Sequence, residues 1–241
     1  MIALGLSLGS KMRKWSVGVV AAALVTHAVA PTLALACREN AMIVFDASGS
    51  MALFRDGRPK IEIAREAARA VLPDITRYRP TGLVTYSGGR GPACSDVKLR
   101  VAPKLNSSNA ILAALRTVDP NGATPLSDSV ELAADSLRRL GSPGIIVLVT
   151  DGLENCGQNA CLLGQRLKGW GDLIRVHVIS FYLHGRAVET INCLSEATGG
   201  TYATTNSLDG LRDALHKVLS CNRISALDAS LSRPALPHPG R

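Results

Sequence analysis

Short apolar runs recur along the middle of the chain and predict six strands. The first is AMIVF at residues 41–45, and the most hydrophobic is GIIVLVTD at residues 144–151. The first run is followed directly by Asp46, and the second ends in Asp151. The other predicted strands cover residues 82–87, 97–103, 174–183 and 201–205. Continuous apolar runs of this length are typical of strands buried on both faces of a parallel sheet.

The segments between these runs have the spacing of amphipathic helices. In residues 60–72, Ile61, Ala64, Ala68 and Val71 fall on one stripe. Further helices are predicted over residues 107–118, 124–140 (with Pro125 in the first turn), 160–171, 189–200 and 207–221. Alternation of strands and helices predicts an α/β fold, a doubly wound and mostly parallel sheet with helices on both faces. Residues 97–103 alternate in polarity and predict one half-exposed, antiparallel edge strand.

Composition fits one sizeable domain, since 46% of the 241 residues are hydrophobic. The formal charge is +8, but residues 1–36 contribute three basic and no acidic residues, so the remainder carries +5. No dense run of Lys and Arg follows. Nucleic acid is therefore not an expected partner.

The N-terminus has the pattern of a secretory signal. A basic region with Lys11, Arg13 and Lys14 precedes the apolar residues 17–25, and an A-x-A site ends at Ala36. We expect a cleaved signal peptide over residues 1–36, a domain over residues 37–223 and a disordered, Pro-rich tail over residues 224–241. The product would be periplasmic or secreted, without a transmembrane segment.

Two other fates of the N-terminus stay open. Residues 17–36 are just long enough for an uncleaved membrane anchor, although His27 and Pro31 interrupt them. The sequence LALAC also loosely resembles a lipoprotein box, in which Cys37 would be lipidated. Lipidation would leave an odd number of cysteines for pairing, which disfavours it.

An even number of cysteines in an exported chain predicts three disulfides. The six are Cys37, Cys94, Cys156, Cys161, Cys193 and Cys221. Cys37 starts the first strand and Cys221 ends the last helix, so we expect these two to join the ends of the domain. The favoured remaining pairs are Cys94–Cys156 and Cys161–Cys193, with Cys156–Cys161 as the local alternative. A soft-metal thiolate site is disfavoured, because C-x₂₋₄-C pairs on both sides are missing.

Candidate chemistry gathers where strands end. Asp46, Ser48 and Ser50 follow the first strand in DASGS, and Asp151 ends the run at residues 144–151. Carboxyl ends of parallel strands meet at one rim of the sheet, so these side chains should lie together. The turn NGATPL adds Thr124 before a helix.

This set of oxygens suits a hard divalent cation such as Mg²⁺, which prefers six oxygen ligands. Asp46 and Asp151 would balance its charge, and the hydroxyls of Ser48, Ser50 and Thr124 would add oxygens without charge. The ion could then accept an acidic side chain from another molecule. Each motif alone is also an ordinary turn or helix cap, so the prediction depends on their joint occurrence.

Taken together, D-x-S-x-S, the Thr-Pro turn and TDG resemble the metal-ion-dependent adhesion site of the von Willebrand factor type A (VWA) family. The resemblance covers about residues 40–221 and includes all five positions: Asp46, Ser48, Ser50, Thr124 and Asp151. The flanking segments look like a bacterial exported branch. The resemblance implies a Rossmann-like VWA fold, a bound Mg²⁺ (or Ca²⁺ or Mn²⁺) ion and a protein-binding function, usually without catalysis.

Two other functions remain as alternatives to a metal-dependent protein-binding module. A metal-dependent hydrolase would need a general base at the rim, for which only Glu154 or His184 is available. A structural envelope protein with a vestigial site needs no metal. A nucleophile elbow is not indicated, because DASGS lacks the first Gly of G-x-S-x-G. We therefore expect no enzymatic activity.

Overall fold

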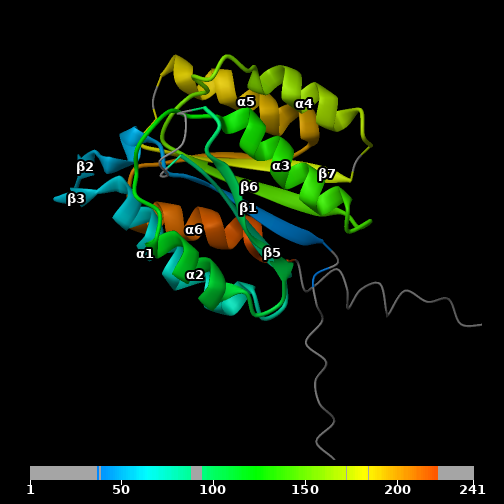
Figure 1. The fold of residues 1–241 in the computed structure, drawn as a ribbon, viewed down its shortest axis with the longest axis horizontal. Coiled ribbons are helices and arrows are strands. Elements are labelled where there is room, and N and C mark those ends of the chain that lie inside the picture. Colours follow the sequence, from blue (N-terminus) through cyan, green and yellow to red (C-terminus); the bar gives the residue numbers. More distant parts are fainter. Residues whose placement is uncertain (1–36, 38, 88–93, 172, 184, 222–241) are drawn as a thin grey trace, which may run out of the picture. The chain divides into compact units, whose positions relative to one another are not determined.

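The computed structural model describes residues 37, 39–87, 94–171, 173–183 and 185–221 (Figure 1). The predicted signal peptide and tail lie outside these residues, and so does His184. The main sheet contains β1 (Asn40–Asp46), β4 (Thr81–Tyr86), β5 (Val97–Lys104), β6 (Gly144–Thr150), β7 (Ile174–Phe181) and β8 (Tyr202–Thr205). The helices are α1 (Lys60–Ile75), α2 (Ser108–Arg116), α3 (Leu126–Arg138), α4 (Ala160–Lys168), α5 (Arg186–Thr198) and α6 (Leu208–Leu219).

The sheet has the strand order β5-β4-β1-β6-β7-β8, and only β5 runs antiparallel. This confirms the predicted fold class, including the antiparallel edge strand. Phe45 of β1 pairs with Thr85 of β4 and Val149 of β6, so the three central strands end at the same level. Residues that follow β1, β4 and β6 therefore share one rim of the sheet.

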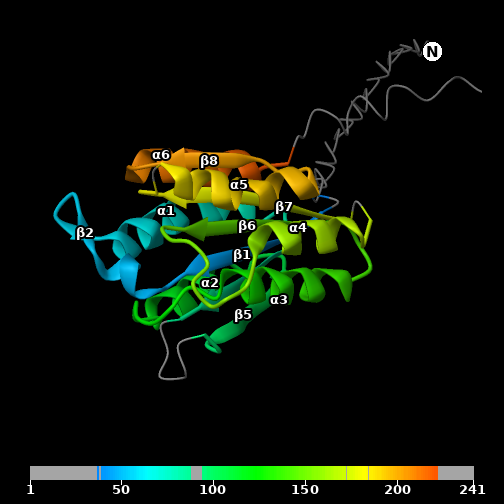
Figure 2. The ribbon, with the colours of Figure 1, turned by 90° about the horizontal axis from the view of Figure 1, so that it is seen from above.

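Two hydrophobic layers hold the helices to the sheet. Along β1, Ile43 and Phe45 pack toward α1, α2 and α6, whereas Met42 and Val44 pack toward α3, α4 and α5. The views in Figures 1 and 2 show these helices on opposite faces. Because successive side chains of a strand point to opposite faces, an unbroken apolar run serves both layers at once.

A short excursion between β1 and α1 has no counterpart among the predicted elements. It consists of a 3₁₀ turn, η1 (Gly49–Ala52), and a small antiparallel hairpin, β2 (Phe54–Arg55) and β3 (Arg58–Pro59). The hairpin projects beyond the end of the main sheet (Figure 2). Two-residue strands carry too few residues for a detectable alternation, which is why the sequence pattern misses them.

Helix boundaries differ from the prediction by one to three residues at most helix ends, and two of these differences involve proline. Helix α1 continues three residues past the predicted end and contains Pro73 in its last turn, where the proline cannot donate a backbone hydrogen bond. The prediction that α3 begins at Thr124 with Pro125 in its first turn was wrong. Pro125 is the N-cap instead, with ψ of 62°, and the helix begins at Leu126.

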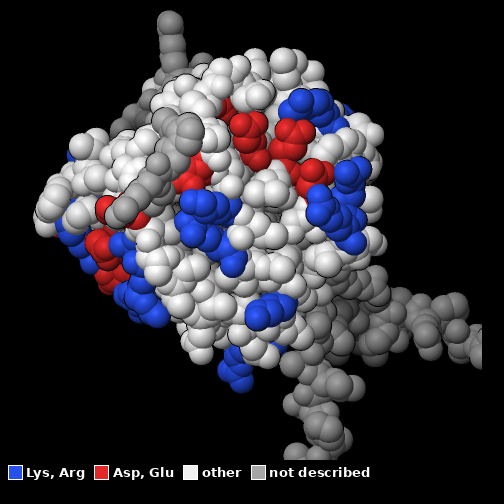
Figure 3. All heavy atoms as spheres, viewed as in Figure 1, with Lys and Arg blue, Asp and Glu red and all other residues white. Residues whose placement is uncertain are grey.

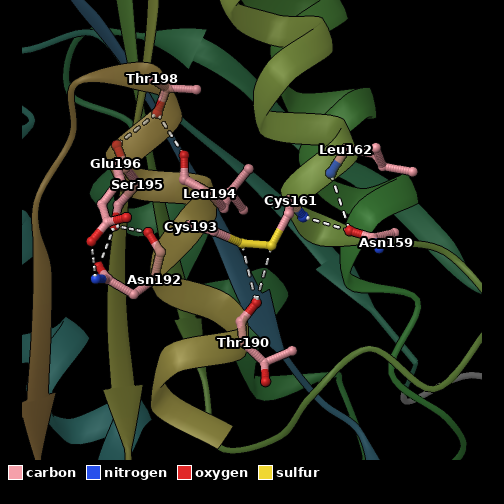
Figure 4. The surroundings of a disulfide bond; sticks show 10 residues. All are labelled: Asn159, Cys161, Leu162, Thr190, Asn192, Cys193, Leu194, Ser195, Glu196 and Thr198. Carbon is pink, nitrogen blue, oxygen red and sulfur yellow. Dashed lines mark hydrogen bonds between the residues drawn. A yellow bond between two sulfur atoms is a disulfide. The ribbon is translucent and has the colours of Figure 1, made fainter.

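The structure contains all three favoured disulfides: Cys37–Cys221, Cys94–Cys156 and Cys161–Cys193. The first packs against the core layer of α1 and α6. The third joins α4 to α5, with the Thr190 carbonyl beside both sulfurs (Figure 4). Three disulfides are typical of periplasmic or extracellular proteins. None of the described helices is long and apolar enough to span a membrane.

Burial of His177 should make the stability of the folded domain depend on pH. His177 of β7 is only 9% exposed, and its Nδ1 accepts a hydrogen bond from the Thr201 backbone N–H (3.1 Å). An acceptor at Nδ1 requires the neutral imidazole. Burial, followed by the Arg175 charge, lowers the pKa of His177 to about 4. Between this value and its ordinary pKa near 6.5 the unfolded chain binds more protons, so stability falls as the pH drops through that window.

Because the unfolded chain takes up a proton at His177 in this range, we expect the free energy of unfolding to fall by up to about 3 kcal/mol between pH 7 and pH 4. Chemical denaturation at both pH values measures the loss. The matched control is His177→Gln, which keeps an acceptor for the Thr201 N–H but does not titrate. The variant should lose less stability than the wild type on acidification; equal losses would contradict the assignment.

Candidate functional site

Asp46 and Asp151 lie side by side at the rim formed by the strand ends. Asp46 is the last residue of β1, and Asp151 follows β6, the neighbouring strand. The Asp151 backbone N–H donates to Asp46 Oδ2 at 3.3 Å, and both residues are buried. Two acids that are 105 positions apart in the sequence therefore meet, as the strand-end rule predicts.

The Asp46 carboxylate is fixed by donors on both of its oxygens. The Ser48 backbone N–H donates to Oδ1 (2.7 Å), and the Thr150 hydroxyl donates to Oδ2 (2.7 Å). Thr150 in turn accepts a hydrogen bond from the Tyr86 hydroxyl (3.0 Å). Burial, and then the charge of Asp46, raise the pKa of Tyr86 well above its ordinary value, so this phenol remains a donor. The network holds Asp46 in one orientation.

Ser48 and Ser50 bring their hydroxyls toward Asp151. Their Oγ atoms are 3.0 Å apart, and Ser50 Oγ donates to Asp151 Oδ1 at 2.5 Å. Ser48 is the N-cap of η1, and its side chain makes no capping bond, which leaves the hydroxyl free for the rim. The turn is held from the other side, because the Gly49 N–H donates to the Gly122 carbonyl (3.1 Å).

Thr124 reaches the same place from the loop before α3. Its backbone N–H donates to Asn155 Oδ1 (2.6 Å), which ties this loop to the segment after Asp151. A Cβ added to Gly152 would lie 3.6 Å from Thr124 Oγ1 and 3.7 Å from Ser50 Oγ. The two hydroxyls therefore border the same small space. All five residues predicted as metal ligands converge on the rim.

Electrostatics at the rim depend on a residue that sequence analysis missed. Burial raises the pKa of Asp151, and the charge of Asp46 raises it further, whereas Lys60 and the Ser50 hydroxyl oppose this effect. The Lys60 ammonium forms an ion pair with Asp151 Oδ2, and both side chains are almost completely buried. Lys60 directly precedes the apolar stripe of α1, and nothing in that pattern distinguishes it from a solvated lysine.

The donor set fits a hard divalent cation. Two buried carboxylates and three hydroxyls supply only oxygen atoms, the ligands that Mg²⁺ and Ca²⁺ prefer. Gly152 has no side chain to fill the space that the hydroxyls of Ser50 and Thr124 border. When bound, such an ion would supply a positive centre for an anionic group from outside.

Glu154, one candidate base for a hydrolase, has both carboxylate oxygens engaged. Oε2 accepts from the Ser127 backbone N–H (2.7 Å) and Oε1 from the Cys156 N–H (2.9 Å). The first of these donors belongs to the first turn of α3, where an acidic side chain also interacts favourably with the helix dipole. Glu154 thus caps a helix and orders the loop that carries Asp151.

Charged side chains are interspersed on the face shown in Figure 3. Lys and Arg form several separate groups, with acidic side chains between them. On this face the described residues offer no continuous basic surface of the kind that follows a phosphate backbone.

Comparisons with known proteins agree with the geometry of the fold. Residues 41–154 match the von Willebrand factor type A domain. The protein YwmC of Bacillus subtilis is 27% identical over 172 residues, which cover 68% of this chain and 75% of YwmC. Among solved structures, the von Willebrand factor type A protein from Catenulispora acidiphila has a TM-score of 0.60 at 18% identity. The match covers 75% of this chain and 42% of the Catenulispora chain.

A second structural neighbour is the PilB minor pilin from Streptococcus sanguinis. Its TM-score is 0.59 at 17% identity, and the match covers 82% of this chain and 64% of the pilin. The match of residues 41–154 and the structure from Catenulispora acidiphila both agree with the fold of a von Willebrand factor type A domain. At such identities the structural likeness shows the fold alone.

Proposed function

We propose that this chain, whose domain has the von Willebrand factor type A fold, is an exported protein-binding module that works through a bound divalent cation. Asp46 and Asp151 would balance the charge of the ion, and Ser48, Ser50 and Thr124 would complete its oxygen shell. Mg²⁺ is the preferred ion, with Ca²⁺ or Mn²⁺ as substitutes. A carboxylate from an acidic residue of a partner protein would take the open coordination position.

One observation carries this proposal: five oxygen-bearing side chains from three distant segments meet at one rim. Ser50 contacts both Ser48 and Asp151, while the Asp151 N–H contacts Asp46. Burial of two adjacent acids is costly unless positive charge compensates them. A divalent cation would relieve this cost, and no catalytic group is required for that role.

The surface beside the site supports a protein partner. Leu53 and Phe54 lead into the β2–β3 hairpin and are 54% and 64% exposed. The Leu53 N–H donates to the Ser50 carbonyl (3.1 Å), so this apolar pair is directly connected to the site. A partner that places an acidic residue on the ion could cover both side chains. The structural neighbour PilB is a minor pilin, which fits an extracellular setting.

The hydrolase alternative has less support. Glu154 would have to give up two backbone hydrogen bonds to act as a base. The structural alternative, with a vestigial site, predicts no effect of metal on stability.

Export is part of the proposal. We infer that the basic and apolar residues of the N-terminus are a signal peptide ending at Ala36, which directs the domain to the oxidising compartment that its disulfides require. Lipid attachment at Cys37 is not favoured, because its sulfur is bonded to Cys221.

Calorimetric titration with MgCl₂ tests the metal site. We expect the wild type to bind one ion per chain and Thr124→Ala to bind about tenfold or more weakly, because a ligand oxygen is lost. The matched control is Ser142→Ala, which removes a hydroxyl that bonds Asn40 near the opposite end of the sheet. It should bind like the wild type. Absence of both binding heat and a thermal shift at saturating Mg²⁺ would favour the vestigial site.

A retention experiment tests the partner. The immobilised wild-type domain should retain a protein with Mg²⁺ and release it with EDTA, whereas Thr124→Ala should retain much less. If neither EDTA nor Thr124→Ala changes the amount of retained protein, the partner does not bind through the ion, even if the domain binds Mg²⁺.

A further inference from the structure

The cation site already contains a positive charge of its own. Lys60, the first residue of α1, is 4% exposed, and its ammonium forms an ion pair with Asp151 Oδ2. Lysine is almost never buried to this extent without a partner. Asp151 Oδ2 accepts no other hydrogen bond from the described residues, so the ammonium is its principal contact there.

Backbone contacts on either side hold Lys60 at this position. The Lys60 N–H donates to the Leu53 carbonyl (3.0 Å), and the Leu53 N–H donates to the Ser50 carbonyl (3.1 Å). The residue that carries the ammonium is therefore connected through two hydrogen bonds to the turn that carries Ser48 and Ser50. These contacts place the first residue of α1 beside the rim, and the ion pair with Asp151 directs its side chain there.

Lys60 and a divalent ion would interact with the same carboxylate. Asp151 has one oxygen on Ser50 and the other on Lys60. An ion among the five oxygens would lie close to the ammonium, and like charges at such distances repel strongly in a buried site. Without an ion, the ammonium offsets one of the two negative charges at the rim.

We infer that Lys60 is a tethered cation that competes with the divalent ion for Asp151 and thereby lowers the metal affinity of the site. This inference rests on the proposed function and adds a residue that regulates it. The lysine stabilises the metal-free domain, and metal binding must overcome its charge. Loss of Lys60 should therefore change two quantities in opposite directions: stability without metal falls, and Mg²⁺ affinity rises.

The test compares wild type and Lys60→Met by calorimetric titration with MgCl₂ and by thermal melting in EDTA. We expect Lys60→Met to bind Mg²⁺ about tenfold or more tightly, to melt at a lower temperature in EDTA, and to gain more from Mg²⁺ than the wild type does. The control is Arg58→Met, which removes the same charge two residues away from a surface pair with Glu66. Its Mg²⁺ affinity should change less than about twofold. Lys60→Gln, which keeps an N–H donor without charge, serves if Lys60→Met does not fold.

The outcomes separate the inference from the proposed function. If the wild type binds Mg²⁺ and both Lys60 variants bind it equally or more weakly, the competition is refuted while the metal site stands. If neither the wild type nor the variants bind Mg²⁺, both proposals fail. If only the Lys60 variants bind it, competition is supported and the wild-type function is not metal-dependent.

Discussion

Replacement of both Cys37 and Cys221 by serine should lower the free energy of unfolding by about 5 kcal/mol. The disulfide closes a loop with a sequence separation of 184 residues. In the chain-entropy model the stabilisation grows with loop length, because the crosslink removes more conformations from the unfolded chain. The two cysteines also pack against the core layer of α1 and α6, where serine adds a polar group. Urea denaturation of both proteins under oxidising conditions measures the difference.

The matched control is Cys161→Ser with Cys193→Ser, which opens a separation of only 32 residues. The same model gives about 4 kcal/mol for this loop. A larger loss for the short loop than for the long one would contradict the entropic account. Full reduction of the wild type should cost more than either double substitution.

The second large effect is expected for Asp46→Ala measured in EDTA. The substitution leaves the Ser48 N–H and the Asp151 N–H without their acceptor in a buried site, whereas the Thr150 hydroxyl can still donate to the Gly152 carbonyl (3.1 Å). Each unsatisfied donor costs about 1–3 kcal/mol, and relief of repulsion with Asp151 offsets part of the sum. We expect a net loss of about 3 kcal/mol by denaturation.

The control Asp46→Asn separates the two roles of this residue. Its amide keeps one acceptor oxygen, so the loss in EDTA should be smaller, about 1–2 kcal/mol. Neither variant should gain stability from Mg²⁺, whereas the proposed site predicts that the wild type will gain about 3 kcal/mol at a concentration 100-fold above its dissociation constant. An Asp46→Asn protein that Mg²⁺ stabilises as much as the wild type would show that Asp46 does not hold the ion.

Much of the arrangement at the rim could be predicted because it depends on strand ends. The apolar runs of β1 and β6 locate two buried strands, and each run leads to an acid that is costly at a buried terminus. Parallel pairing of adjacent strands then brings Asp46 and Asp151 together. The same topology separated Cys37 and Cys221 from the four cysteines at the rim and so predicted their bond. It left the pairing of the other four open, and only the tertiary structure decided it. The metal, its ligand and the absence of catalysis stay predictions.

The sequence by itself determined the layers of this protein, because hydrophobic burial acts on the pattern of each segment and that pattern is local. Only the tertiary structure decided the roles of Lys60 and Glu154. Lys60 neutralises Asp151 and Glu154 caps α3, whereas the sequence indicates Glu154 only as a candidate base and does not distinguish Lys60 at all. Charge pairing depends on the distance between side chains that are 91 residues apart for Lys60 and Asp151. Such a distance is set by how the η1 turn, the β2–β3 hairpin and the helices pack, and no local pattern records it.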